Sequence, residues 1–258
     1  MDFIDSHAHL YLEDFSDDLV SVVENAQEVG ISQVLLPNID RSTLPQLIKT
    51  CKTYPHFFKP MLGLHPTSVG ADYKEELESI KEEFVNPSVN YIAIGEVGLD
   101  LYWDKTYQEQ QIEAFKEQLR WSIQYQLPVV VHSRDAYVEL ESILKLSEFS
   151  AAYGVIHSFT GTEQDLQQFL PLEQWSIGIN GIVTFKNSNL STIIKKIPLD
   201  RLLIETDSPY LTPEPFRGRR NESKYLFHTL KKIAEVYECS TAEMAEITRN
   251  NTLKLFRI

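Results

Sequence analysis

Short apolar runs of strand length alternate along this chain with longer segments whose apolar residues recur at helical spacing. Two of the runs, 129–131 (Val-Val-Val) and 202–204 (Leu-Leu-Ile), are continuously apolar, as is typical of parallel strands that are buried on both faces. Repeated alternation of strand and helix predicts parallel pairing. The eight predicted strands are 3–6, 33–37, 58–64, 91–96, 128–132, 154–157, 174–179 and 201–205.

Helical spacing is found between the predicted strands and again after the last of them. Eight strand and helix units in 258 residues match the size of a (β/α)8 TIM barrel, an α/β fold. A doubly wound fold would have fewer strands and a glycine-rich loop after the first. We expect one domain, 1–258, because no linker-like segment interrupts the chain. The predicted helices are 17–29, 44–53, 73–84, 108–125, 136–146, 163–170 and 190–196, followed by two outer packing helices, 222–237 and 241–256, the latter capped by Ser240 with Glu243.

The composition is that of an ordinary globular protein, with 43% hydrophobic and 24% charged residues. A net charge of −13 argues against a passive nucleic-acid binder, because contact with a polyanion would then need local cations or bound metal. Only Cys51 and Cys239 are present, so neither a disulfide framework nor a cysteine zinc site is expected. The first residues show no secretory signal and no run is long enough to span a bilayer, so we expect a cytoplasmic protein without a membrane partner.

Polar residues follow the predicted strands at the ends where barrel enzymes carry their chemistry. His7 and His9 are two residues apart, so both imidazoles can converge on one ion. Histidine and carboxylate ligands suit divalent ions, and the number of candidates suggests two ions bridged by a carboxylate, with Mg²⁺, Mn²⁺ or Zn²⁺ as the candidates. Two such ions suit hydrolysis, and no GxSxG elbow or Walker loop suggests another chemistry. The residues at predicted strand ends are His7, His9, His65, Glu96, His132, His157, Glu205 and Asp207.

Three further features are ambiguous in the sequence. The arginines of 217–220 could grip phosphate, or they could pair with surface acids in a solvated loop. His65 could contact substrate or could stabilise the turn that Pro66 enforces. Tyr102, Trp103 and Phe159 could stack on a base, but we expect them to cover the rim of the barrel.

Four segments together resemble the TatD family of metal-dependent deoxyribonucleases. They are 5–10 (Asp-Ser-His-Ala-His-Leu), 94–100 (Ile-Gly-Glu-Val-Gly-Leu-Asp), 132–136 (His-Ser-Arg-Asp-Ala) and 205–211 (Glu-Thr-Asp-Ser-Pro-Tyr-Leu). Further similar segments, 63–66, 157–161, 181–186 and 217–222, extend the resemblance over nearly the whole chain. The resemblance implies a (β/α)8 barrel of the amidohydrolase superfamily that hydrolyses phosphodiester bonds of DNA.

The resemblance also implies a role for each site residue. One ion would be held by His7, His9 and Asp207, the second by His132 and His157, and Glu96 would bridge them. The catalytic residues would be Glu96 and Asp207, and Asp207 would orient or deprotonate the attacking water. Glu205 would anchor a ligand without binding metal. His65 and Arg217 would contact the scissile or a neighbouring phosphate.

Two positions depart from the family pattern, which commonly has an acidic residue at Tyr11 and proline at Ser223. We expect these differences to affect the substrate-access loops. The leading hypothesis is a monomeric metal-dependent exonuclease acting on DNA that is single-stranded or has an accessible end. The alternatives are an amidohydrolase for a small amide, ester or cyclic substrate, and a binding protein with a structural metal site. The arginines of 217–220 favour the nuclease, because a neutral amide does not need them.

Overall fold

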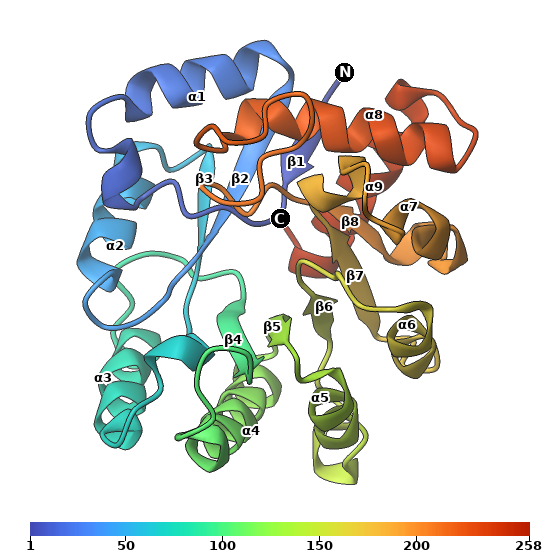
Figure 1. Ribbon diagram of the computed structural model, residues 1–258. Helices are drawn as coiled ribbons and strands as arrows, with labels where there is room; N and C mark the ends of the chain where they lie inside the picture. Colours follow the sequence, from blue (N-terminus) through green and yellow to red (C-terminus); the bar gives the residue numbers. More distant parts are fainter.

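Eight parallel strands form a barrel that is surrounded by helices, as the computed structural model of residues 1–258 shows (Figure 1). All eight predicted strands are present, and the predicted (β/α)8 TIM barrel is confirmed. Most strand boundaries move by one to three residues relative to the sequence prediction. The strands are β1 (Phe3–Asp5), β2 (Ile31–Pro37), β3 (Phe58–Met61), β4 (Ile94–Asp100), β5 (Val129–Arg134), β6 (Gly154–Ile156), β7 (Trp175–Ile179) and β8 (Leu202–Ile204).

The barrel closes through two short contacts between two parallel sheets. One sheet has the order β1-β2-β3 and the other the order β4-β5-β6-β7-β8. A bridge between Leu62 and Ile94 joins β3 to β4. At the other seam Ala8 pairs with Ser208, and the Ser6 amide donates to the Ile204 carbonyl at 3.1 Å. Residues from the two ends of the chain therefore lie side by side.

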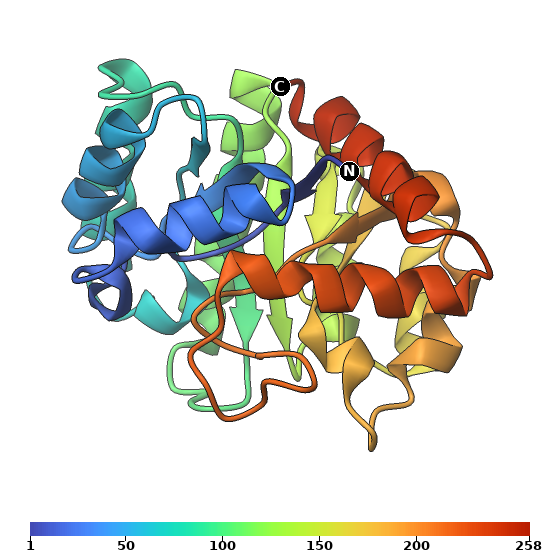
Figure 2. The ribbon, with the colours of Figure 1, turned by 90° about the horizontal axis from the view of Figure 1, so that it is seen from above.

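The helices cover the outside of the barrel, and α1 and α8 lie next to each other on one side of it (Figure 2). None of the helices combines the length and the apolar character that crossing a bilayer requires. The helices are α1 (Leu19–Glu28), α2 (Leu44–Thr53), α3 (Tyr73–Val85), α4 (Gln108–Tyr125), α5 (Tyr137–Leu144), α6 (Glu163–Phe169), α7 (Leu190–Ile193), α8 (Leu226–Val236) and α9 (Thr241–Phe256). Short 3-10 helices occupy Glu13–Phe15, Pro66–Ser68, Ser147–Phe149, Gly181–Thr184, Ile194–Lys196, Leu199–Arg201 and Ser223–Tyr225.

Helix α9 has the predicted bounds, but its last turn lies in an unexpected position in the fold. The Ser240 hydroxyl accepts a hydrogen bond from the Glu243 amide at 3.1 Å, which is the expected cap. At its other end Phe256 packs in a buried cluster with apolar side chains from inside the barrel. The prediction of a purely outer helix is therefore wrong for this end, which closes the amino-terminal mouth of the barrel. The barrel side chains in the cluster are Ile4, Leu35, Met61, Ile92, Ala93, Val130, Val155 and Leu203.

Strand β4 lies further along the chain than the apolar run predicted, because it continues through polar residues that face the interior. Glu96 and Asp100 are both buried within it. Gly98 makes this extension possible, since its φ is +142° and it pairs with His132 of β5. A Cβ atom at Gly98 would lie 2.1 Å from the His132 carbonyl oxygen. The close approach of β4 and β5 therefore requires glycine at this position.

Replacing Gly98 with alanine should destabilise the fold by at least about 3 kcal/mol, because an unfavourable φ is combined with a backbone clash. Gly218→Ala is the matched control. Its φ is also positive, at +85°, but nothing lies within 4 Å of the added Cβ, so we expect a loss of about 1 kcal/mol. Urea unfolding of both variants measures the difference. Equal loss of stability in the two variants would contradict the proposed close packing of β4 against β5.

Candidate metal centre

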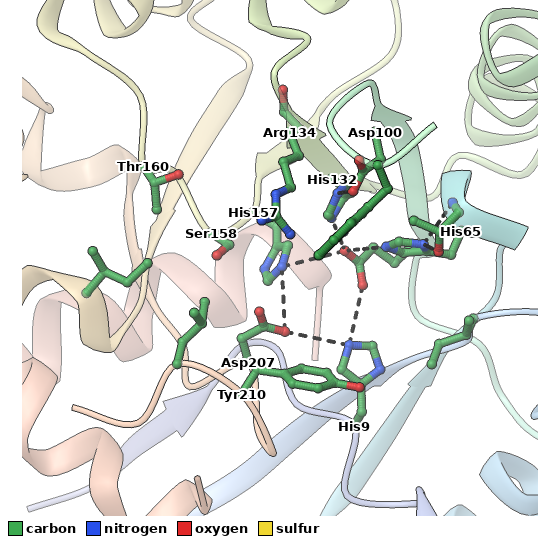
Figure 3. Close-up of a pocket in the computed structure, with 17 residues that line it drawn as sticks. His9, His65, Asp100, His132, Arg134, His157, Ser158, Thr160, Asp207 and Tyr210 are labelled. Atoms are coloured by element: carbon green, nitrogen blue, oxygen red, sulfur yellow. Dashed lines mark hydrogen bonds and ion pairs between the residues drawn. The ribbon is translucent and has the colours of Figure 1, made fainter. Parts of the chain in front are cut away.

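A cavity of about 700 Å³ opens at the carboxyl ends of the strands, where the sequence placed the candidate chemistry (Figure 3). In Figure 3 the side chains of His9, His65, His132, His157 and Asp207 face one another from strand ends and following segments that are far apart in the sequence. The polar lining of the cavity contains most of the predicted site residues. These are His9, His65, Glu96, His132, His157 and Asp207, joined by Asp100, Ser133, Arg134, Ser158 and Tyr210.

The carboxylate of Glu96 lies at the centre of the cluster and its two oxygens face different histidines. Oxygen Oε2 lies 3.1 Å from Nε2 of His7 and 3.4 Å from Nε2 of His9. Oxygen Oε1 lies 2.9 Å from Nδ1 of His132 and 3.6 Å from Nε2 of His157. This arrangement places Glu96 between two pairs of imidazoles, the position that a bridging ligand would occupy.

His7, His9 and Asp207 form a compact group on one side of Glu96. The Nε2 atoms of the two histidines are 3.3 Å apart, although β1 itself ends at Asp5. Asp207 Oδ1 lies 3.8 Å from His7 Nε2 and 3.7 Å from His9 Nε2. Asp207 follows β8 with φ of +59°, a conformation that is uncommon outside glycine and typical of constrained sites.

Two further carboxylates hold the histidines on the other side of Glu96. Asp100 Oδ2 lies 3.1 Å from Nε2 of His132, whose other ring nitrogen faces Glu96. Glu205 Oε1 lies 3.0 Å from Nδ1 of His157, and Glu205 also accepts a hydrogen bond from the Ser158 amide. A carboxylate behind an imidazole fixes the orientation of the ring and strengthens it as a ligand. Glu205 thus contacts a candidate ligand, as the resemblance implied, and Asp100 is an equivalent partner that the sequence reasoning missed.

The hydrogen bonds of His65 define which of its nitrogens carries the proton. The Thr67 amide donates to Nδ1 at 3.2 Å, so the lone pair of Nδ1 is occupied. In the neutral ring the proton is then on Nε2, which lies 3.5 Å from Glu96 Oε1. His65 therefore presents an N–H donor to the cavity. This state suits contact with an anion better than binding of a metal, even though His65, Glu96 and His132 lie close enough to form a ligand group.

Burial and neighbouring charges give the histidines of the cluster different pKa values. Burial lowers the pKa of His7 to about 3, and the charge of His157 acts in the same direction, so His7 is neutral at pH 7. Burial also disfavours the charged form of His157, but Glu205 and Glu96 outweigh it and raise its pKa to about 10. Burial likewise opposes protonation of His132, yet Asp100 and Glu96 raise its pKa to about 9.

The two central carboxylates respond in opposite directions. Burial opposes ionisation of Glu96, but the surrounding histidines, led by His7, hold its pKa well below the usual range. Burial raises the pKa of Asp207 to about 6, although His157 and His9 lower it. In the absence of a cation the cluster holds protons on His132 and His157, and a divalent ion would displace them.

The donor set fits divalent cations. Two nitrogens bound to one zinc ion at about 2.0–2.1 Å and the tetrahedral angle are about 3.3–3.4 Å apart, which matches the separation of the His7 and His9 nitrogens. Within the protein these facing Nε2 atoms meet each other and the carboxylate oxygens of Glu96 and Asp207. A shared cation would satisfy the facing lone pairs. Nitrogen and oxygen donors in this number suit zinc or manganese, and the carboxylates also suit magnesium.

A buried hydrogen-bond network supports the segment that carries Asp207. Asp5 accepts from the Thr206 amide at 2.9 Å, from the Thr206 hydroxyl at 2.7 Å and from the Ser223 hydroxyl at 2.6 Å. Asn221 donates to the carbonyls of Thr206, at 2.9 Å, and Tyr210, at 2.6 Å. The Asp5 bonds join β1 to two segments that follow β8, one at Thr206 and one at Ser223.

The two departures from the family pattern lie behind the site and away from its mouth. The Tyr11 hydroxyl donates to the Pro37 carbonyl at 2.7 Å and lies 3.4 Å from Nδ1 of His9. Ser223 belongs to the Asp5 network just described. Both residues are fully buried, and their contacts support the segments that carry His9 and Asp207. An effect on the substrate-access loops stays a prediction.

The rim of the cavity differs from the sequence expectation. Arg217 is not among the residues that line the cavity, and its guanidinium lies 4.0 Å from the ring centre of Phe185. Arg220 pairs with Asp18 at 2.6 Å. Phe159 is fully buried, as a covering role requires, whereas Trp103 is 70% exposed and lines the cavity.

The cavity contains one Lys or Arg side chain, that of Arg134. This residue lies in the family-like segment 132–136, but no role was predicted for it. The signal was available, because Arg134 is two residues beyond His132 on the same strand and therefore on the same face. The same alternation relates Asp100 to Glu96 on β4.

A barrel with histidines and carboxylates gathered at the carboxyl ends of its strands defines a metal-dependent hydrolase of the TIM-barrel type. Residues 4–257 match the family described as TatD related DNase. The chain belongs to this TatD family.

Individual relatives cover nearly the full chain. An uncharacterized metal-dependent hydrolase of Bacillus subtilis, YabD, is 38% identical over 255 residues, which is 98% of each chain. A Rahnella protein named 3'-5' ssDNA/RNA exonuclease TatD is 35% identical over 95% of this chain and 94% of its own. The crystal structure of the TatD homologue YjjV from Escherichia coli superposes with a TM-score of 0.92 at 30% identity, covering 99% of this chain and 98% of that one.

Removing metal should lower thermal stability, because a ligand that binds only the folded state stabilises it by mass action. At a metal concentration of 100 times Kd the gain is about 2.7 kcal/mol, which corresponds to a fall of about 5–10 °C in Tm on chelation. Thermal unfolding with EDTA, and then with excess Mn²⁺ or Zn²⁺, measures the shift. Glu96→Gln should lose most of it. An equal shift in wild type and Glu96→Gln would argue against Glu96 as a ligand.

Proposed function

We propose that this protein is a divalent-metal-dependent deoxyribonuclease that removes nucleotides from an accessible, single-stranded DNA end. The observation that carries the proposal is Glu96, whose two oxygens face two separate sets of imidazoles in one cavity. Such a site suits two ions, and two ions suit the displacement of one phosphate oxygen by another. The activity named for the Rahnella relative supports a nuclease and extends the test to RNA.

Seven side chains divide the work of the proposed site. His7, His9 and Asp207 would hold one ion, His132 and His157 the other, and Glu96 would contact both. When bound, divalent ions lower the pKa of water and polarise phosphate oxygens. Glu205 keeps the His157 ring in place through its 3.0 Å contact with Nδ1, and so acts as a positioning residue.

Asp207 would orient the attacking water and take its proton. It reaches the cavity from the end of β8, and its Oδ1 lies 3.8 Å from His7 Nε2 and 3.7 Å from His9 Nε2. His65 presents its Nε2 proton to the same space and would donate it to a phosphate oxygen in a charge-assisted hydrogen bond. Asp207 would therefore supply a proton acceptor and His65 an anion contact, one near each carboxylate oxygen of Glu96.

The shape of the cavity supports action at a strand end. Its volume of about 700 Å³ is in the range of pockets for small ligands, so it can receive one or two nucleotides. A flexible single strand can enter such a concave site, whereas a stacked duplex keeps its phosphates on the outside of a wide cylinder. We therefore favour terminal release of nucleotides over cleavage within a duplex.

An end-labelled DNA oligonucleotide tests the proposal directly. Incubation with Mg²⁺, Mn²⁺ or Zn²⁺ should release mononucleotides, and EDTA should stop the release. The position of the label gives the polarity, and a matching RNA oligonucleotide tests the sugar. Mid-chain products would reject the terminal mode. Intact DNA and RNA with metal-loaded, folded protein would reject the nuclease in favour of a small-molecule amidohydrolase.

His132→Ala and Asp207→Ala should each lower kcat by at least about 1,000-fold, because each removes a group that serves the reaction and not the core. Circular dichroism and thermal unfolding in EDTA should show that both variants fold. Gln174→Ala, just before β7 and outside the cavity lining, is a suitable control and should keep full activity. Full activity in either site variant would overturn the assignment.

Arg217→Ala separates the two interpretations of the basic loop. If Arg217 leaves Phe185 to contact the phosphate chain, its loss should raise KM for DNA about 5-fold or more while bound metal stays constant. Steady-state kinetics with metal analysis on the same samples measures both quantities. An unchanged KM would show that the loop is a solvated surface feature.

A further inference from the structure

Arg134 is a cation without a carboxylate partner at the mouth of the cavity. The protein carries a net charge of −13, and no carboxylate lies within 4.0 Å of the Arg134 guanidinium. Its side chain extends from β5 toward the hollow that holds His157 and Asp207 (Figure 3). Arg134 is the one Lys or Arg side chain in the lining of this cavity, and it adds a fixed positive charge at the rim, where a phosphate of a bound strand would pass.

Two exposed aromatic rings hold the guanidinium. Its carbon Cζ lies 4.0 Å from the ring centre of Tyr102 and 4.9 Å from that of Trp103. The two rings meet edge to face, with centres 4.9 Å apart. Backbone contacts fix this loop, because the Leu101 amide donates to the Arg134 carbonyl at 2.9 Å and the Tyr102 amide to Asp100 Oδ1 at 3.1 Å.

Trp103 lies between two neighbouring pockets and lines both of them. It lines the main cavity and also a neighbouring pocket of about 290 Å³, and Thr67 and Asp100 are shared by the two as well. A chain that leaves the metal site through the second pocket must pass the Trp103 ring. The other tryptophans, Trp121 and Trp175, are each 1% exposed, so Trp103 is the exception in leaving a large apolar ring in water.

We propose that Tyr102, Trp103 and Arg134 form a nucleotide-binding clamp for the part of a single strand next to the bond that is cleaved. The Trp103 ring stacks on a base, and the Arg134 guanidinium pairs with the adjoining phosphate. The clamp rests on the proposed nuclease function and makes it more specific. It selects single-stranded polynucleotides over mononucleotide esters, with little dependence on base identity because every base has a stacking face.

Intrinsic fluorescence tests the clamp without catalysis. With EDTA present, titration with an eight-residue oligothymidylate should quench tryptophan emission, because a base stacks on the Trp103 ring. The change reports on Trp103, since the other two tryptophans are buried. Binding of the same oligonucleotide is followed in parallel by the anisotropy of a terminal dye. Binding without quenching would overturn the stacking of Trp103. An oligonucleotide of abasic residues should bind more weakly and leave the emission unchanged, and oligouridylate should quench as oligothymidylate does.

Kinetics with metal-loaded enzyme tests the same residues in turnover. Trp103→Leu and Arg134→Gln should each raise KM for the oligonucleotide at least about 5-fold with kcat little changed, and Trp103→Phe should retain most of the affinity. Arg257→Gln is the matched control, since Arg257 lies 5.4 Å from the Tyr153 ring at the opposite end of the barrel. It should leave KM unchanged.

The two proposals fail in different ways. Hydrolysis of oligonucleotides with KM unaltered by Trp103→Leu and Arg134→Gln would overturn the clamp and leave the nuclease intact. Absence of hydrolysis by folded, metal-loaded wild type would overturn the nuclease, and the fluorescence titration would still decide whether a strand binds at Trp103. A KM effect equal for the oligonucleotide and for a mononucleotide p-nitrophenyl ester would also contradict the clamp, because the ester has no neighbouring nucleotide.

Discussion

Four histidines surround the carboxylate of Glu96. One ring nitrogen of each lies within 3.6 Å of a Glu96 oxygen. Charged and polar groups buried at this density are costly unless each has a partner. Asp100 and Glu205 contact the ring nitrogens of His132 and His157 that face away from Glu96. Divalent ions would be the partners of the nitrogens that face Glu96. The barrel has to hold these groups rigidly, and the tight pairing of β4 with β5 at Gly98 serves this need.

The fold was predictable because the apolar pattern along the chain is regular. Eight apolar runs and their intervening helices identified every strand of the barrel. The errors occur where tertiary contacts override the local pattern. Strand β4 extends to Asp100 because buried polar residues continue the pairing, and no apolar run marks them. The placement of Phe256 inside the amino-terminal mouth depends on side chains from seven other segments, and helical spacing alone cannot reveal such a contact.

For the candidate site, the sequence identified which side chains would meet but not how each would act. Strand-end position brought His7, Glu96, His132 and Asp207 into one side-chain cluster. Side-chain alternation could have added Asp100 and Arg134, since each shares a face with a residue already chosen. The protonation of His65 could not be read in the same way, because it follows from one backbone hydrogen bond. The exposure of Trp103 depends on how its loop folds back onto β5.

The seam between β1 and the segment after β8 also has a consequence for biosynthesis. Asp5 contacts Thr206 and Ser223, and Ala8 pairs with Ser208, so the first strand stays unpaired on one edge until β8 and the segment after it have been made. Chains are synthesised from the amino terminus, and contacts of long sequence separation form late in folding. His7 and His9 therefore exist long before Asp207 and Glu205 join them. The ligand group of His7, His9 and Asp207 can therefore assemble only after residue 207 has been made, whereas Glu96, His132 and His157 are all present much earlier.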